Sequence, residues 1–177
     1  MPRKIPEPWH SFLREVDDGL RGRVEIHCLG AFVLMVLWGL PRPTGDIDIV
    51  EAAPTEATRE LLNLGGKGSE LSRKYGLQIH RVGIAEYPDN YAARLTDITP
   101  AEFSRLRIMA FDAMDVVLAK LARNNARDRQ DVAFLVERGA IAKDERPHLR
   151  MGSREALTLE LWLEEFFPNA SIDSKAT

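Results

Sequence analysis

The sequence predicts an α/β protein of the α+β type, in which helices flank a short mixed β-sheet and the C-terminal portion is helical. Three observations lead to this prediction. Short apolar segments of strand length alternate with segments whose apolar residues recur at helical spacing. Glycine and proline stand at many of the junctions between these segments. After residue 111 the apolar pattern is helical only.

Composition and charge limit the classes of protein to consider. A chain of 177 residues with 45% hydrophobic residues is long and apolar enough for one domain with a full core. Its net charge of −3 argues against a general DNA binder, whose affinity rests on a broad basic surface. An RNA partner held by a local basic patch stays open.

No segment of the sequence indicates a membrane or secreted protein. The longest apolar run, residues 31–40, is too short to cross a bilayer, and the chain opens with no signal-peptide pattern. We therefore expect a cytoplasmic protein. The single cysteine, Cys28, has no partner for an internal disulfide and lies in an apolar stretch, so we expect a buried hydrophobic residue.

The chain is expected to form one domain with short extensions. Residues 1–8, which include three prolines, are expected to be an N-terminal arm, and residues 9–168 a single domain. Within it, residues 9–111 are the α/β core and residues 112–168 the C-terminal helices. Residues 169–177 are polar and are expected to be a disordered tail.

The α/β core is expected to contain five strands and four helices. The strands are predicted at residues 24–29, 46–50, 77–82, 95–98 and 106–111. The helices are predicted at residues 9–20, 31–37, 56–64 and 69–75. Gly39 and Pro41 end the second helix, and Gly76 ends the fourth. Thr55 is expected to be the N-cap of the third helix, with Pro54 outside it.

Three helices are expected in the C-terminal portion. Asp112 caps the first, the second covers residues 127–138, and the last, rich in aromatic residues, covers residues 153–167. The first has an apolar stripe formed by Met114, Val117, Leu118 and Leu121. Lys120 lies roughly 110° around the helix from the centre of this stripe. We expect it to lay its stem on apolar surface and deliver its ammonium to a groove.

Asp46 and Asp48 are the clearest chemical signal in the sequence. On a strand alternate side chains share a face, so the two carboxylates would lie about 6–7 Å apart along the strand. Carboxylates aimed the same way suit a hard divalent cation such as Mg²⁺ or Mn²⁺, which also takes substrate phosphate oxygens. The more specific of two interpretations is a site that binds and uses an NTP. Taken alone, the Asp-x-Asp pattern is more often a turn with a solvated face.

The residues before the acidic strand favour the NTP site. Gly30 follows an apolar segment of strand length, and a helical segment begins at Ala31. A glycine lets the backbone approach a phosphate closely, and the helix N-terminus offers it free N–H groups. Arg42 either steadies a triphosphate, pairs with a site carboxylate, or is an ordinary surface arginine. Thr44 stands where it can orient Asp46.

Together with residues further on, this segment resembles the nucleotidyltransferase superfamily over residues 24–138. The residues that carry the resemblance are Gly30-Ala31, Arg42-x-Thr44-x-Asp46-x-Asp48, Asp115-x4-Lys120-Leu121-x-Arg123 and Arg127-Asp128-x2-Asp131. The most similar branch is a group of small bacterial proteins related to the AbiEii-type toxins of toxin–antitoxin and phage-defence loci.

The resemblance implies a nucleotidyltransferase-like fold and a site for an NTP with Mg²⁺ or Mn²⁺. It implies that Asp46 and Asp48 are metal ligands, and that they are catalytic together with Lys120 and Asp128. The nucleotide-binding residues that it implies are Gly30, Ala31, Arg42, Thr44, Lys120, Arg123 and Asp131.

Two positions depart from the pattern of the family. Many nucleotidyltransferases bring a third carboxylate to the metal from the neighbouring strand, where this sequence has His80. Asp97, in the following segment, is a candidate replacement. Ala31 stands where family members often have glycine or serine, and it lacks the serine hydroxyl that would contact a phosphate.

Asp128 falls close to the centre of the apolar stripe of helix 127–138, and Asp131 falls near its edge. A carboxylate on a packing face is unfavourable unless it is paired. Asp128 is therefore either the N-cap of this helix or part of a buried network. In that network Asp128 or Asp131 would orient Lys120, Arg123 or the metal site.

Two function hypotheses from different classes follow. The first is transfer of a nucleoside monophosphate from an NTP to an RNA acceptor, such as tRNA, or to a protein, in a toxin–antitoxin or defence setting. The alternative is a catalytically degenerate fold that binds a cognate toxin or antitoxin, which His80 and Ala31 motivate. A metal-dependent nuclease fits the two aspartates but explains Gly30 and Lys120 less well.

Overall fold

The computed structural model describes residues 4–83, 85, 87–123 and 125–141. The predicted helix at residues 153–167 and the tail at residues 169–177 lie outside these described residues. None of the helices in the described part is long and apolar enough to cross a membrane.

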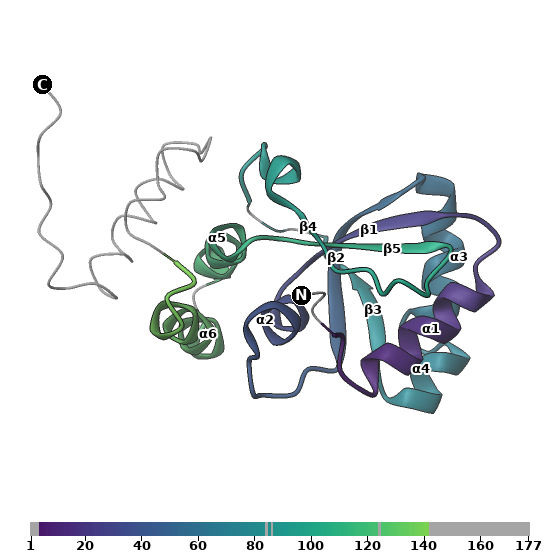
Figure 1. Cartoon of the computed structure of the whole chain (residues 1–177), viewed down its shortest axis with the longest axis horizontal. Helices are drawn as coiled ribbons and strands as arrows, with labels where there is room; N and C mark the ends of the chain where they lie inside the picture. The colour runs from purple at the N-terminus through teal and green to yellow at the C-terminus, as the bar shows by residue number, and fades with distance from the viewer. Residues whose placement is uncertain (1–3, 84, 86, 124, 142–177) are drawn as a thin grey trace, which may run out of the picture.

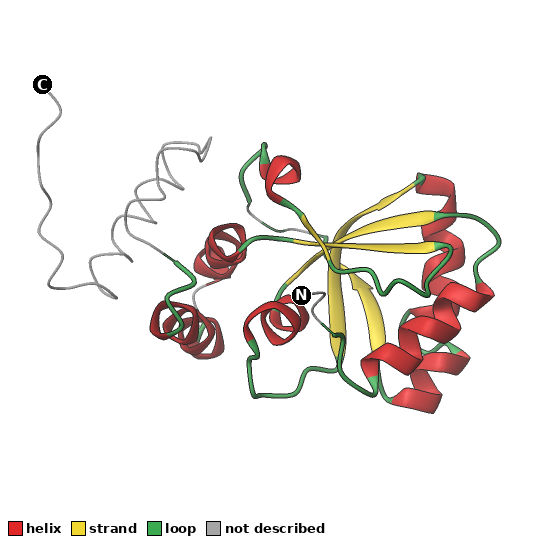
Figure 2. Ribbon diagram, in the orientation of Figure 1, coloured by secondary structure: helices red, strands yellow, loops and turns green. Residues whose placement is uncertain are grey.

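The centre of the fold is a mixed five-stranded sheet with the strand order β3-β2-β1-β5-β4 (Figures 1 and 2). The strands are β1 (Val24–Leu29), β2 (Asp46–Ala53), β3 (Gln78–Arg81), β4 (Thr96–Asp97) and β5 (Leu106–Ala110). Strand β1 runs antiparallel to β2 and parallel to β5, and β2 runs parallel to β3. All five predicted strands and the mixed character of the sheet are confirmed.

In the described part of the chain, six α-helices flank this sheet. Helices α1 (Trp9–Gly19), α3 (Thr55–Gly65) and α4 (Glu70–Tyr75) lie together, and α3 packs on β1, β2 and β3 (Figure 1). Helices α2 (Ala31–Trp38), α5 (Ala113–Arg123) and α6 (Ala126–Glu137) form a second group, because α6 packs against both others. A short 3₁₀ helix, η1 (Tyr91–Arg94), precedes β4. The predicted fold class is confirmed.

The helix starts correct two predictions. Thr55 is the first residue of α3, and Pro54 is its N-cap, whose carbonyl accepts a hydrogen bond from the N–H of Ala57 at 3.0 Å. The fixed φ of proline is compatible with this position. Helix α6 begins at Ala126, and its N-cap is Asn125, not Asp128.

The core extends further towards the N-terminus than the sequence predicts. The side chain of Ile5 is buried, and α1 buries its apolar face beside it. The part of the predicted arm that the structure describes is therefore anchored to the domain, because an isoleucine gains about 2 kcal/mol when it leaves water. Cys28 is fully buried, as predicted, and burial raises the pKa of its thiol.

Asp17 joins α1 to the start of β5. Although only 2% of this residue is exposed, its Oδ1 accepts hydrogen bonds from the N–H groups of Arg105 at 2.7 Å and Leu106 at 2.6 Å. Its Oδ2 accepts one from the N–H of Ser104 at 3.0 Å. Burial raises the pKa of Asp17, but these hydrogen bonds outweigh burial and the net pKa lies below the ordinary value of 3.8.

We expect Asp17→Ala to lower the free energy of unfolding by about 3 kcal/mol, because it leaves several buried N–H groups without partners. Thermal or urea unfolding measures this loss. Since folding lowers the pKa, the contribution of Asp17 is complete above the unfolded value and disappears as pH falls through the folded value. Its neighbour Asp18 is exposed, so Asp18→Ala is the control and should change stability by no more than about 0.5 kcal/mol. Equal effects of the two variants would contradict the anchoring role.

Candidate functional site

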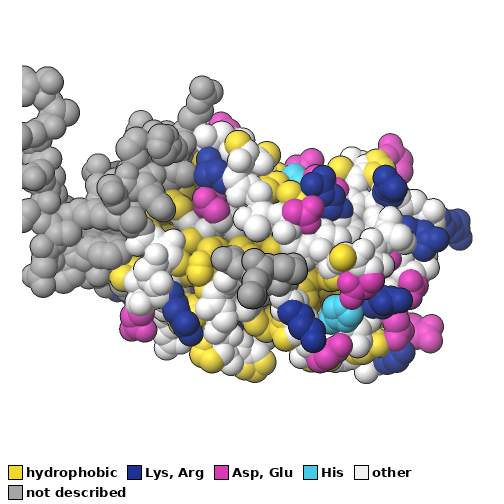
Figure 3. All heavy atoms as spheres, in the orientation of Figure 1, with side chains coloured by type: hydrophobic (Ala, Val, Ile, Leu, Met, Phe, Trp, Pro, Cys, Tyr) yellow, Lys and Arg dark blue, Asp and Glu magenta, His cyan; other side chains and the backbone are white. Residues whose placement is uncertain are grey.

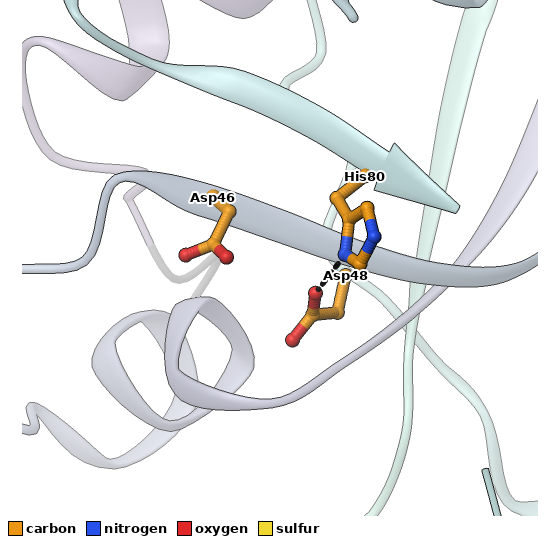
Figure 4. Close-up of side chains that lie close together, drawn as sticks. All are labelled: Asp46, Asp48 and His80. Carbon is orange, nitrogen blue, oxygen red and sulfur yellow. Dashed lines mark hydrogen bonds and ion pairs between the residues drawn. The ribbon is translucent and has the colours of Figure 1, made fainter. Parts of the chain in front are cut away.

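Asp46 and Asp48 project from the same face of β2, as Figure 4 shows. Ile47 and Ile49, which alternate with them, are fully buried on the other face. Both carboxylates are partly buried, so they are held in place and still reach solvent. The prediction that these two side chains share a face is confirmed.

His80 completes a group of three possible metal ligands. Strand β3 lies parallel to β2 with His80 directly beside Asp48. One ligand atom from each of Asp46, Asp48 and His80 lies within 4.8 Å of the others. The Nδ1 atom of His80 is 3.0 Å from Oδ1 of Asp48 (Figure 4). In the sequence His80 stands out only as the residue in place of a third carboxylate, because the register between β2 and β3, which brings together residues 32 positions apart, is not visible there.

Asp97 does not take the place of the third carboxylate, so that suggestion is wrong. It lies on β4, and the strand order puts β1 and β5 between β4 and the strand of Asp46 and Asp48. Its carboxylate accepts a hydrogen bond from Nε of Arg107 at 3.1 Å. Asp97 is thus part of an ion pair at the opposite edge of the sheet.

Thr44 holds Asp46, as predicted. Its hydroxyl donates a hydrogen bond to Oδ1 of Asp46 at 3.0 Å. A carboxylate that accepts a fixed hydrogen bond on one oxygen keeps its other oxygen turned in one direction. Thr44 is therefore a positioning residue for Asp46.

Gly30 places the start of α2 against Asp48. Its φ of 85° is a conformation that other residues rarely adopt, and a Cβ atom added there would lie 2.9 Å from Oδ2 of Asp48. Gly30 is the N-cap residue of α2, and the first turn of a helix has N–H groups without partners inside the helix. The positive end of α2 thus lies beside the carboxylate of Asp48, with Ala31 as the first residue of the helix.

A buried ionic network lies on α5 and α6. Nζ of Lys120 is 2.6 Å from Oδ2 of Asp131 and 3.3 Å from Oδ1 of Asp128. The guanidinium of Arg42 binds both carboxylate oxygens of Asp131, and Arg123 binds Asp128 at 2.9 Å. Burial raises the pKa of Asp131, but the hydrogen bonds from Arg42 and Lys120 outweigh burial and hold the pKa below its usual range.

This network decides between the alternatives for Asp128 and corrects the placement of Lys120. Asp128 is 3% exposed and paired, so it belongs to a buried network and is not an N-cap. Lys120 is 2% exposed, so its ammonium does not reach an open groove. A lysine ammonium is stable at this depth when carboxylates replace the water molecules that would otherwise hydrate it. Asp128 and Asp131 do so for Lys120.

The loop before β2 connects the network to the aspartates. Arg42 pairs with Asp131 on α6, and two residues later Thr44 binds Asp46. Of the three possibilities for Arg42, the pairing with a carboxylate is the one observed. The network is therefore placed to hold the loop that orients Asp46.

A second buried pair fixes the segment before β4. Asp115, the first residue of the Lys120 motif, is completely buried and binds Arg94 of η1 at 3.0 and 2.6 Å. Burial raises the pKa of Asp115 to about 6, although the hydrogen bonds from Arg94 act in the opposite direction. Asp115 therefore has a structural partner of its own and does not join the network around Lys120.

The donor atoms near Asp46 fit a divalent cation. Two carboxylates and one imidazole are ligands that Mg²⁺, Mn²⁺ and other divalent ions take, in whole or in part. On the face that Figure 3 shows, basic and acidic side chains are interspersed across the described residues. This face therefore presents no broad surface of one sign, and the local negative charge of Asp46 and Asp48 is what would attract a cation to the site.

A short mixed sheet that presents two aspartates on one strand, beside a glycine-led helix start, is the arrangement that the resemblance to nucleotidyltransferases implies. The chain belongs to the family described as nucleotidyltransferase of unknown function, DUF6036, whose model matches residues 13–142. No curated protein and no solved structure matches the chain. The match covers every described residue of the site, and it supports the superfamily resemblance without the finer relation to AbiEii-type toxins.

Proposed function

We propose that this protein transfers a nucleoside monophosphate from an NTP to an acceptor and releases pyrophosphate. The observation that carries the proposal is the convergence of Asp46, Asp48 and His80 beside the start of α2, in a chain of a nucleotidyltransferase family. In this reaction an acceptor oxygen forms a bond to the α-phosphorus, and the bond from that phosphorus to pyrophosphate breaks. The proton of the acceptor passes to solvent.

Asp46 and Asp48 would hold the cation, Mg²⁺ or Mn²⁺, which supplies Lewis-acid stabilisation to the phosphate oxygens. Thr44 keeps Asp46 aimed at it. The backbone N–H groups at the start of α2, around Gly30 and Ala31, would bind the phosphates, and the positive end of the helix dipole would favour their negative charge. Asp46 and Asp48 lie on a strand and Gly30 and Ala31 at the start of a helix, which keeps the positions of these four residues well defined.

The buried residues of the network on α5 and α6 would act on the phosphates only indirectly, through the arginines that they hold. Arg42 and Arg123 are the two cations of the network that reach solvent, with side chains 29% and 48% exposed, and we assign them phosphate contacts. Asp131 and Asp128 hold these guanidinium groups, and Lys120 lies between the two carboxylates. In this assignment Lys120, Asp128 and Asp131 are positioning residues.

The acceptor proposed from the resemblance is an RNA, such as tRNA, or a protein, within a toxin–antitoxin or defence locus. An acceptor of either kind presents the hydroxyl or phosphate oxygen that the transfer needs. The cognate toxin or antitoxin would be a protein partner under the same proposal.

The test is calorimetric titration of the full chain with each of the four NTPs, in Mg²⁺, in Mn²⁺ and in EDTA. We expect at least one NTP to bind with either cation and to lose most of its affinity in EDTA, because phosphates and carboxylates need the cation between them. Equal affinity with and without cation would contradict the metal site. Absence of binding by every NTP would overturn the proposal and favour the partner-binding alternative.

A further inference from the structure

The donor set at the site differs from the all-oxygen set that Mg²⁺ prefers. Two ligand groups are the carboxylates of Asp46 and Asp48, and the third is the imidazole of His80. Mg²⁺ binds oxygen atoms almost exclusively and retains much of its water, whereas Mn²⁺, a transition-metal ion, gains more than Mg²⁺ does from an imidazole nitrogen beside the carboxylates. We infer that His80 is a ligand of the bound cation and that it selects Mn²⁺ over Mg²⁺. The inference rests on the proposed function.

The position of His80 satisfies what a ligand needs. Ligand bonds of about 2.0–2.2 Å to one ion leave two ligand atoms at most about 4.4 Å apart. The three atoms here lie within 4.8 Å of one another, so small side-chain rotations suffice to bring them onto one ion. The parallel pairing of β2 and β3, with Asp48 beside His80, fixes the backbone of both residues.

The imidazole is also free to change partners. The side chain of His80 is 57% exposed and that of Asp48 is 18% exposed, so an ion reaches them from solvent. Nδ1, the nitrogen near Asp48, is the one that would bind the ion, and the other ring nitrogen points away from the carboxylates (Figure 4). Binding would replace one hydrogen bond between His80 and Asp48 with two bonds to the cation.

The experiment compares the dissociation constants of MnCl₂ and MgCl₂ for the full chain without nucleotide, by calorimetry. His80→Asp places a third carboxylate at the same point and makes the donor set all oxygen. We expect the ratio of the Mg²⁺ to the Mn²⁺ dissociation constant to fall by about tenfold in this variant. Arg81→Gln is the matched control. It changes the charge by the same amount at the next residue of β3, whose side chain faces the other side of the sheet.

Pulsed electron paramagnetic resonance of the Mn²⁺ complex gives a direct second readout. A nitrogen coupling to the Mn²⁺ signal is expected in the wild type and in Arg81→Gln, and it should be absent in His80→Asp. An unchanged ratio of dissociation constants, or a wild-type spectrum without nitrogen coupling, overturns the role of His80 and leaves the proposed function standing. If neither cation binds the wild type, with or without NTP, the metal site itself fails and the proposed function fails with it.

Discussion

The double variant Asp46→Asn/Asp48→Asn is expected to have a cation-dependent affinity for NTP that is lower on the order of 100-fold or more. Replacing a residue that only orients a metal ligand lowers the metal affinity about 10–100-fold. Replacing two ligands themselves should lower the affinity further. Asparagine keeps the shape of the side chain and leaves an oxygen for the Thr44 hydroxyl. The measurement is the calorimetric titration with cation described above, and nucleotide transfer should fall to background in the same variant.

A stability measurement separates this effect from misfolding. Since the double variant removes two neighbouring negative charges that have no buried cation between them, its unfolding temperature should equal or exceed that of the wild type. Asp89→Asn, which removes an exposed carboxylate from a loop, should leave NTP affinity unchanged. If the double variant binds NTP with cation as tightly as the wild type, Asp46 and Asp48 are not the metal site.

The second large effect is expected at Lys120. Lys120→Met should lower the free energy of unfolding by about 3–5 kcal/mol, because Asp128 and Asp131 would then remain charged and buried with one partner fewer each. Methionine has nearly the length of lysine, so the loss of packing volume is small. Urea unfolding measures the change.

A compensating variant tests this explanation. In Lys120→Met with Asp131→Leu, the lysine and its closest carboxylate are both replaced by apolar groups, and much of the lost stability should return. Arg42, which loses its partner in this variant, is 29% exposed and can be hydrated. If the double variant is less stable than Lys120→Met, the ionic pairing of Lys120 is not the cause of the first loss.

Local patterns in the sequence were sufficient for the elements around Asp46 and Asp48. Strand alternation places the two aspartates together, and the glycine between an apolar segment and a helical segment predicts where α2 begins. These features depend on residues that are neighbours in the chain. The fold class follows from the same short-range signals, since each strand and helix has its own periodicity.

The burial of Lys120 could not be predicted from helical geometry alone, whereas for Asp128 the same geometry left a place in a buried network as one of two alternatives. The angular count places Lys120 at the flank of one helix, but it does not show that α6 packs beside that flank. Asp128 is a candidate N-cap because its side-chain oxygen can accept hydrogen bonds from free backbone N–H groups. In the structure Asn125 is the N-cap and accepts the N–H of Asp128 at 2.9 Å, while the side chain of Asp128 pairs with Lys120 and Arg123.

The sequence by itself determined the order of strands and helices along the chain, the shared face of Asp46 and Asp48, and the position of Gly30 between the first strand and the second helix. Only the tertiary structure decided which distant groups meet. It placed His80 beside Asp48, removed Asp97 to the far edge of the sheet, and paired Arg42 with Asp131 across 89 residues. The physical reason is that periodicity describes one element at a time. Strand register and helix packing depend on how all elements share a single core.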